Sequence, residues 1–129
     1  MSGDVLGSAH RVLDAHEQAM KAADLDGVVA NAADDIVVLL PGSPLIEGRG
    51  AFQEFYGQLL AAGPAEFQHH YSGEEVLGNA AVFHGVAGGT ATGPDGSPIA
   101  MENNFVLILK PNAAGQMKIW RVAFGPTSM

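Results

Sequence analysis

Histidines and asparagines are the residues of this sequence whose types and positions could support chemistry. His16 lies in the middle of an apolar stripe with helical spacing. A histidine there is either a core residue with satisfied hydrogen bonds or a group that meets a ligand. Asn103 and Asn104 precede the apolar run Phe105 to Leu109, which is typical of a strand. Alternation sends the two amides to opposite faces, so one points inward and needs either a structural hydrogen bond or a ligand.

A second pair of adjacent residues, His69 and His70, lies on another predicted strand, so these rings also point to opposite faces. We expect His70 to be the one that lines a cavity or a dimer face. The sequence has no cysteine, no His-x-x-x-His pair and no clustered carboxylates. It therefore predicts neither a metal site nor a cofactor.

Motifs of the common enzyme classes are missing from the sequence. There is no pair of carboxylates placed for general acid–base hydrolysis, no G-x-S-x-G, no phosphate-binding loop and no dinucleotide fingerprint. A formal net charge of −8 disfavours nucleic acid and anionic membranes as partners. The longest apolar run, Ile36 to Leu40, is far shorter than a membrane span, so we expect a cytoplasmic protein with no membrane partner.

The first half of the chain has the spacing of helices. Apolar residues predict a long helix over about residues 4–22, and Asp24 is suited to cap a short helix over residues 25–31. A β-branched run predicts a strand over residues 36–40 that Pro41 stops. A third helix then presents Phe52 and Tyr56 on one face and ends at residues 63–64, a Gly-Pro pair.

The second half alternates, as strands do. Four strands are predicted over residues 67–77, 80–91, 99–110 and 116–124, and their short, turn-rich connections predict an antiparallel meander. The layout is α+β: three N-terminal helices packed on one face of a strongly curved antiparallel sheet, which together form a cone with an apolar interior. We expect residues 1–129 to form a single domain.

Three stretches of sequence together resemble the nuclear transport factor 2-like (cystatin-like) superfamily, which includes ketosteroid isomerases and SnoaL-type polyketide cyclases. They are ADLDGVVANAADDIVVL, PGSPLIEGRGAFQEFY and the final AAGQMKIWRVAFG, and the resemblance covers roughly Val5 to Gly125. It implies the cone-shaped fold and a homodimer. It is unspecific for function, because one fold hosts many unrelated activities.

Within this superfamily, the ketosteroid isomerases imply roles for individual positions. Their general base precedes the turn proline, where this sequence has Leu40, and leucine cannot move a proton. The resemblance places His16 and Asn103 at the positions of the groups that hydrogen-bond the oxyanion. It also makes Tyr56 a supporting residue and Trp120 a lining residue on the last strand.

Two classes of function, with a third held open, follow from these residues. The first is a binding protein for a small hydrophobic molecule, with Leu40, Phe52, Tyr56, His70, Asn103 and Trp120 as candidate binding residues and His16 as a further contact. The second is an isomerase, cyclase or hydrolase that acts on a polycyclic or ketone metabolite and uses a histidine, His16 or His70, as acid or base. The third is a domain that only mediates association.

Overall fold

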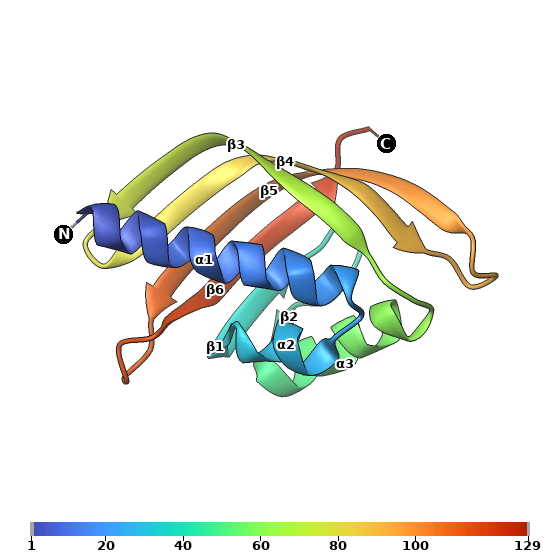
Figure 1. Ribbon diagram of the computed structural model, residues 1–129, viewed down its shortest axis with the longest axis horizontal. Coiled ribbons are helices and arrows are strands. Elements are labelled where there is room, and N and C mark those ends of the chain that lie inside the picture. Colours follow the sequence, from blue (N-terminus) through green and yellow to red (C-terminus); the bar gives the residue numbers. More distant parts are fainter. Residues whose placement is uncertain (1, 129) are drawn as a thin grey trace.

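Three helices cover the inner face of a curved six-stranded sheet in the computed structural model, which describes residues 2–128 (Figure 1). The helices are α1 (Ser2–Lys21), α2 (Leu25–Ala30) and α3 (Arg49–Ala61). The strands are β1 (Ala32–Leu39), β2 (Ile46–Glu47), β3 (Glu66–Leu77), β4 (Ala80–Thr92), β5 (Pro98–Pro111) and β6 (Met117–Pro126). This α+β layout confirms the predicted fold class.

The strands lie in the order β2-β1-β6-β5-β4-β3, so the last four strands form the antiparallel meander that their connections predict. One contact differs from a purely antiparallel sheet, because β1 lies parallel to β6. The first strand also begins at Ala32, four residues earlier than predicted, and the short strand β2 pairs with its end. Among the described residues, no helix is long and apolar enough to cross a membrane.

Helix α1 lies along the sheet near β3 (Figure 1). It buries Ala9 and Ala19 of the predicted apolar stripe, together with Leu13 and Met20, which the stripe did not include. Two histidine–glutamate contacts of opposite order connect it to β3. His10 Nε2 of α1 lies 2.7 Å from Glu74 Oε1 of β3. Further along α1, Glu17 contacts the ring of His69 on β3. Asp24 then caps α2 by accepting a hydrogen bond from the Gly27 amide at 3.1 Å, as predicted.

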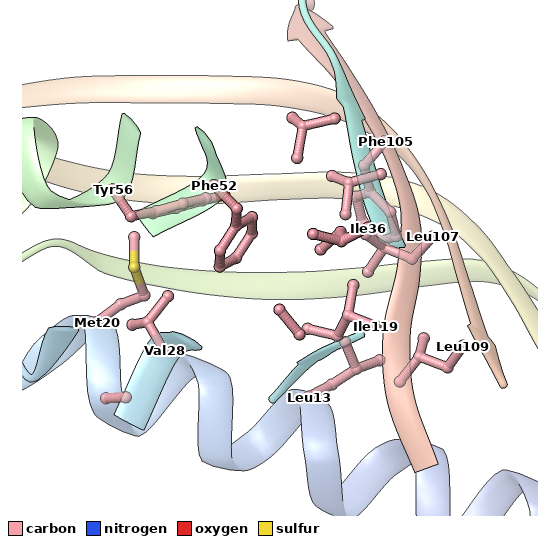
Figure 2. Packing of buried hydrophobic residues seen from close by; sticks show 14 of the residues in the cluster. Leu13, Met20, Val28, Ile36, Phe52, Tyr56, Phe105, Leu107, Leu109 and Ile119 are labelled. Atoms are coloured by element: carbon pink, nitrogen blue, oxygen red, sulfur yellow. The ribbon is translucent and has the colours of Figure 1, made fainter. Parts of the chain in front are cut away.

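A continuous apolar core fills the space between the helices and the sheet. Figure 2 shows Phe52 and Tyr56 of α3 across from Met20 and Val28, with Leu107 and Leu109 of β5 at the sheet. Because α1, α3 and the long strands all contribute, no single layer can be removed without exposing the others.

The strong curvature of the sheet depends on a glycine and on bulges. A side chain at Gly85 would place its Cβ 1.9 Å from the carbonyl oxygen of His70, so only glycine lets β3 and β4 approach there. The pairing of β3 with β4 shifts between Tyr71 and Gly73, and that of β5 with β6 shifts between Ile108 and Leu109. Such bulges bend a strand and increase its twist.

Leu109 provides a test of this core. Its side chain is 0% exposed, whereas Leu77 at the end of β3 is 60% exposed. We expect Leu109→Ala to lower the free energy of unfolding by about 2–5 kcal/mol, because it leaves a cavity. The control Leu77→Ala should change it by less than about 0.5 kcal/mol. Urea denaturation followed by circular dichroism measures both; equal losses would contradict the assigned core.

Candidate functional site

A cavity of about 160 Å³ lies between α1, α3 and the inner face of the sheet. Most of its wall is apolar and includes Leu13, Met20, Phe52, Phe55, Phe67 and Phe105. Met101, which is partly exposed, also lines it, so the cavity reaches the surface at the β5 side. The site is therefore a mostly apolar pocket with few polar groups, the usual form of a small-molecule site.

The only acid–base pair in this wall joins α1 to β3, as far as residues 2–128 show. Glu17 Oε2 accepts a hydrogen bond from the His69 backbone amide at 3.1 Å, and the same oxygen pairs with Nδ1 of the His69 ring. The His69 side chain is 12% exposed and that of Glu17 is 23% exposed. A proton on Nδ1 is thus held by the carboxylate, which leaves Nε2 as the nitrogen able to accept a proton.

Packing also holds the His69 ring in place. The ring of Phe105 meets it edge-on with centroids 5.1 Å apart, and the ring of Tyr71 stacks on it at 5.9 Å. A carboxylate that orients an imidazole is a recurring arrangement in nucleophilic and acid–base sites. The pair is therefore able to take a proton from a bound molecule and to return it.

His16 lines the same cavity but has a different environment. Its Nδ1 is buried and has no hydrogen-bond partner among the described residues. Burial lowers the pKa of His16 to about 4, and the Coulombic effect of nearby His69, when that ring is protonated, acts in the same direction. The ring meets Tyr56 edge-on at 6.0 Å. His16 is consequently a neutral imidazole at pH 7, with a polar atom that the protein leaves unpaired.

Tyr56 and Asn103 complete the polar part of the wall. Burial raises the pKa of Tyr56 to about 12, so its hydroxyl stays protonated and can donate a hydrogen bond. Asn103 is 9% exposed and lines the cavity, whereas Asn104 is exposed on the outer face. The structure thus decides which of the two amides points inward, a choice that the sequence left open.

Strand register places the polar residues relative to one another. His69 of β3 pairs with Ala87 of β4, and Ala87 pairs with Asn103 of β5. Residues paired across neighbouring strands point to the same face, so these three form one row across the floor of the cavity. His69 and Asn103 stand at the two ends of the row, with only a methyl group between them.

Among the predicted lining residues, His16, Phe52, Tyr56 and Asn103 border the cavity. His70 does not, because it follows inward-facing His69 and is exposed on the outer face. The prediction that it lines the cavity is wrong, while a place at a dimer face stays a prediction.

Trp120 also lies outside the cavity, which corrects the prediction for the last strand. Ile108 pairs with Arg121 and Leu109 with Ile119, so Trp120 is the extra residue of the β6 bulge. It faces outward, where its ring lies between Lys110 Nζ at 3.9 Å and Arg121 Cζ at 3.7 Å. Its Nε1 donates a hydrogen bond to Asp35.

The predicted pocket floor at Leu40 is wrong as well. Leu40 follows the end of β1 and packs against the edge of the core, and it is not among the residues that line the cavity. It borders a shallow groove beside Val106 and Asn104 instead. Leu40 therefore says nothing about what the cavity floor can bind.

Glu17 and His69 are the site residues that sequence reasoning missed. Phe67, His69 and Tyr71 alternate with polar residues, a signal that places His69 on the apolar face. No comparable signal marks Glu17, which follows His16 at the edge of the apolar stripe. Its contact with His69 spans 52 residues of sequence and depends on how α1 lies on the sheet.

Comparison with known proteins agrees with this architecture. A family model described as SnoaL-like domain matches residues 12–120. No curated protein sequence matches the chain. The solved structures that resemble it have the nuclear transport factor 2-like (cystatin-like) fold.

Three of these structures illustrate the range of descriptions. A ketosteroid isomerase-like protein from Erwinia carotovora atroseptica is 20% identical, with a TM-score of 0.78 over 93% of this chain and 94% of that one. A proposed dehydratase of the nuclear transport factor 2-like family from Streptomyces avermitilis is 16% identical, with a TM-score of 0.77 over 100% of both chains. A proposed calcium/calmodulin-dependent protein kinase II association domain from Xanthomonas campestris is 16% identical, with a TM-score of 0.81 over 93% and 86%. At these identities the likeness shows the fold alone.

The environment of His16 predicts a pH dependence of stability. Its pKa of about 4 in the folded protein lies below the 6.5 of an unfolded chain, so the unfolded state binds the proton more tightly. The stability contribution of neutral His16 is complete above pH 6.5 and is lost as the pH falls toward 4. We expect wild type to lose about 3 kcal/mol more than His16→Phe between pH 7.5 and 4. Urea denaturation at both pH values measures this, and parallel losses would contradict it.

Proposed function

Because the chain belongs to the SnoaL-like domain family, we propose that its cavity binds a small, largely apolar molecule and that the Glu17–His69 pair transfers a proton to or from it. The observation that carries this proposal is an oriented imidazole in the wall of an apolar cavity. Low polarity around the pair strengthens its interactions with a bound molecule. The proposed activity is that of an isomerase or a dehydratase.

In the proposed reaction, His69 Nε2 takes a proton from a carbon next to a carbonyl group. The electron pair of the broken C–H bond moves toward the carbonyl oxygen and forms an enolate. Neutral donors stabilise such an oxyanion without adding charge to the site, and Asn103, Tyr56 and His16 are of this kind. In a β,γ-unsaturated ketone the proton then returns to the γ-carbon, which gives the conjugated isomer. In a β-hydroxy ketone the C–O bond at the β-carbon breaks instead, and the hydroxyl group takes the proton and leaves as water.

This scheme differs from the one that the ketosteroid isomerases imply. Their base precedes the turn proline, where this chain has Leu40, and Leu40 does not line the cavity. Here the base comes from β3 and its orienting carboxylate from α1. The change of position keeps the base in the wall of the cavity, where it can reach a proton of a bound molecule, as general-base catalysis requires.

Binding without chemistry is the second candidate function. It is favoured by the wall itself, which is mostly apolar, and by the neutral state of His16, which suits a hydrogen bond to a ligand rather than proton transfer. In this case Glu17 and His69 only hold α1 on the sheet. The two candidates predict different results when His69 is replaced.

Exchange of deuterium into cyclohexanone in D2O, followed by NMR, tests proton transfer. We expect His69→Gln to lower the protein-dependent exchange rate by about 10²–10⁴-fold, the usual contribution of a general base. Glu17→Gln should cause a smaller loss of exchange rate. Packing against Phe105 and Tyr71 still holds the His69 ring, but the ring no longer has a carboxylate as the partner of its Nδ1. His70→Gln is the matched control, since that neighbouring ring lies on the outer face, and it should stay within about twofold of wild type.

Equal exchange by wild type and His69→Gln would exclude the catalytic role. A wild-type rate no higher than that of buffer would exclude it too. Either result, combined with retained binding of cyclohexanone, would leave the binding function.

We also propose that the protein forms a homodimer through the outer face of the sheet. Val106 of β5 is 44% exposed there, beside a shallow groove formed by Leu40, Pro41 and Ala123. Exposed apolar side chains grouped on a sheet face favour association. The family resemblance implies a homodimer as well.

Light scattering after gel filtration tests the dimer. We expect a wild-type mass of two chains and a mass of one chain for Val106→Asp, because a buried unpaired carboxylate opposes association. Leu77→Asp, an equally polar change at an exposed site remote from the groove, should leave the mass at two chains. A monomeric wild type would overturn this proposal and leave the one for the cavity untouched.

A further inference from the structure

Ala87 occupies the centre of the cavity floor, between His69 and Asn103. Its small side chain leaves space between these two polar residues. Neighbouring strands are about 4.8 Å apart, so the backbones of His69 and Asn103 are separated by about 10 Å across Ala87. The inner residues on either side of Ala87 along β4 are Gly85 and Gly89. The inner face of this stretch of β4 thus carries no side chain larger than a methyl group.

From this geometry we infer that the ligand is an uncharged molecule with a single ring that lies over Ala87, with one polar group toward His69 and another toward Asn103. Ala87 then determines which ligands fit. The inference rests on the proposed function of the cavity and specifies the substrate class of the same site.

The size of the ligand follows from the volume of the cavity. A cavity of about 160 Å³ is close to the engineered cavity of about 150 Å³ that binds benzene. One six-membered ring with short substituents therefore fills it, and a fused second ring would have to project through the opening beside Met101 or displace aromatic side chains such as Phe67 and Phe105, which border the floor.

The absence of charge follows from the groups in the wall. None of the described side chains that line the cavity is a lysine or arginine, so an anion would meet the Glu17 carboxylate without a free cation to balance it. A cation would have to take Glu17 away from His69. In contrast, a carbonyl group can accept a hydrogen bond from the neutral amide of Asn103, and a hydroxyl group can donate one to Nε2 of His69.

Three probes separate these properties: 4-hydroxycyclohexanone, its anionic analogue 4-oxocyclohexanecarboxylate, and the fused two-ring ketone 2-decalone. NMR titration of the isotopically labelled protein gives a dissociation constant for each. We expect 4-hydroxycyclohexanone to bind at least tenfold more tightly than either of the other two. The inference is overturned if the carboxylate or 2-decalone binds as tightly, or if 4-hydroxycyclohexanone does not bind.

Substitution of the floor tests the place of the ring. Ala87→Leu should weaken binding of 4-hydroxycyclohexanone at least tenfold, because the added carbons occupy the position of the ring. Val86→Leu, one residue away and paired with outward-facing His70 and Asn104, is the matched control and should change binding less than twofold. Thermal melting verifies that both variants fold, and Ala87→Val replaces Ala87→Leu if the larger residue prevents folding. Unchanged binding by the folded Ala87 variant overturns the inference.

His69→Gln distinguishes failure of this inference from failure of the proposed function. If it binds 4-hydroxycyclohexanone with the same preference over the other probes but exchanges protons as fast as wild type, proton transfer by His69 is excluded and the ligand class stands. If wild type shows no preference among the probes while His69→Gln still loses proton exchange, the ligand class is excluded and the catalytic role stands.

Discussion

Each residue of a β-strand presents its side chain to one face of the sheet, and on this constraint the chemistry of the interior depends. It directs His69 and Asn103 inward and sends His70 and Asn104, their chain neighbours, to the outer face. The contact between α1 and the sheet also depends on this alternation, because Glu17 can reach the His69 ring only when that ring points toward the helix. A shift of one residue in β3 would leave the Glu17 carboxylate in the wall without its imidazole partner.

Much of the fold could be predicted because its signals are local. Helical spacing, the Asp24 cap and the turn residues between the last four strands each act within a few residues of sequence. The parallel contact of β1 with β6 could not be predicted in this way, since it joins residues more than 80 positions apart. Strand β2 is only two residues long and carries no periodicity.

The site was predictable where alternation is regular and unpredictable where it is interrupted. His16 and Tyr56 follow from helical spacing, and Asn103 from one of two possible registers. Trp120 was placed wrongly because a bulge makes it and the next residue both face outward, which no count along the sequence reveals. Glu17 was missed because its role depends on a contact between α1 and β3, and such contacts are set by packing rather than by local pattern.

The bulge in β6 has an optical consequence. Trp120 is the only tryptophan of the chain, and it lies on the outer face between two cationic side chains. Intrinsic fluorescence excited at the red edge of protein absorption therefore comes from the side of the sheet opposite the cavity. Emission from this indole therefore reports directly on what covers the outer face of the sheet in the unmodified protein.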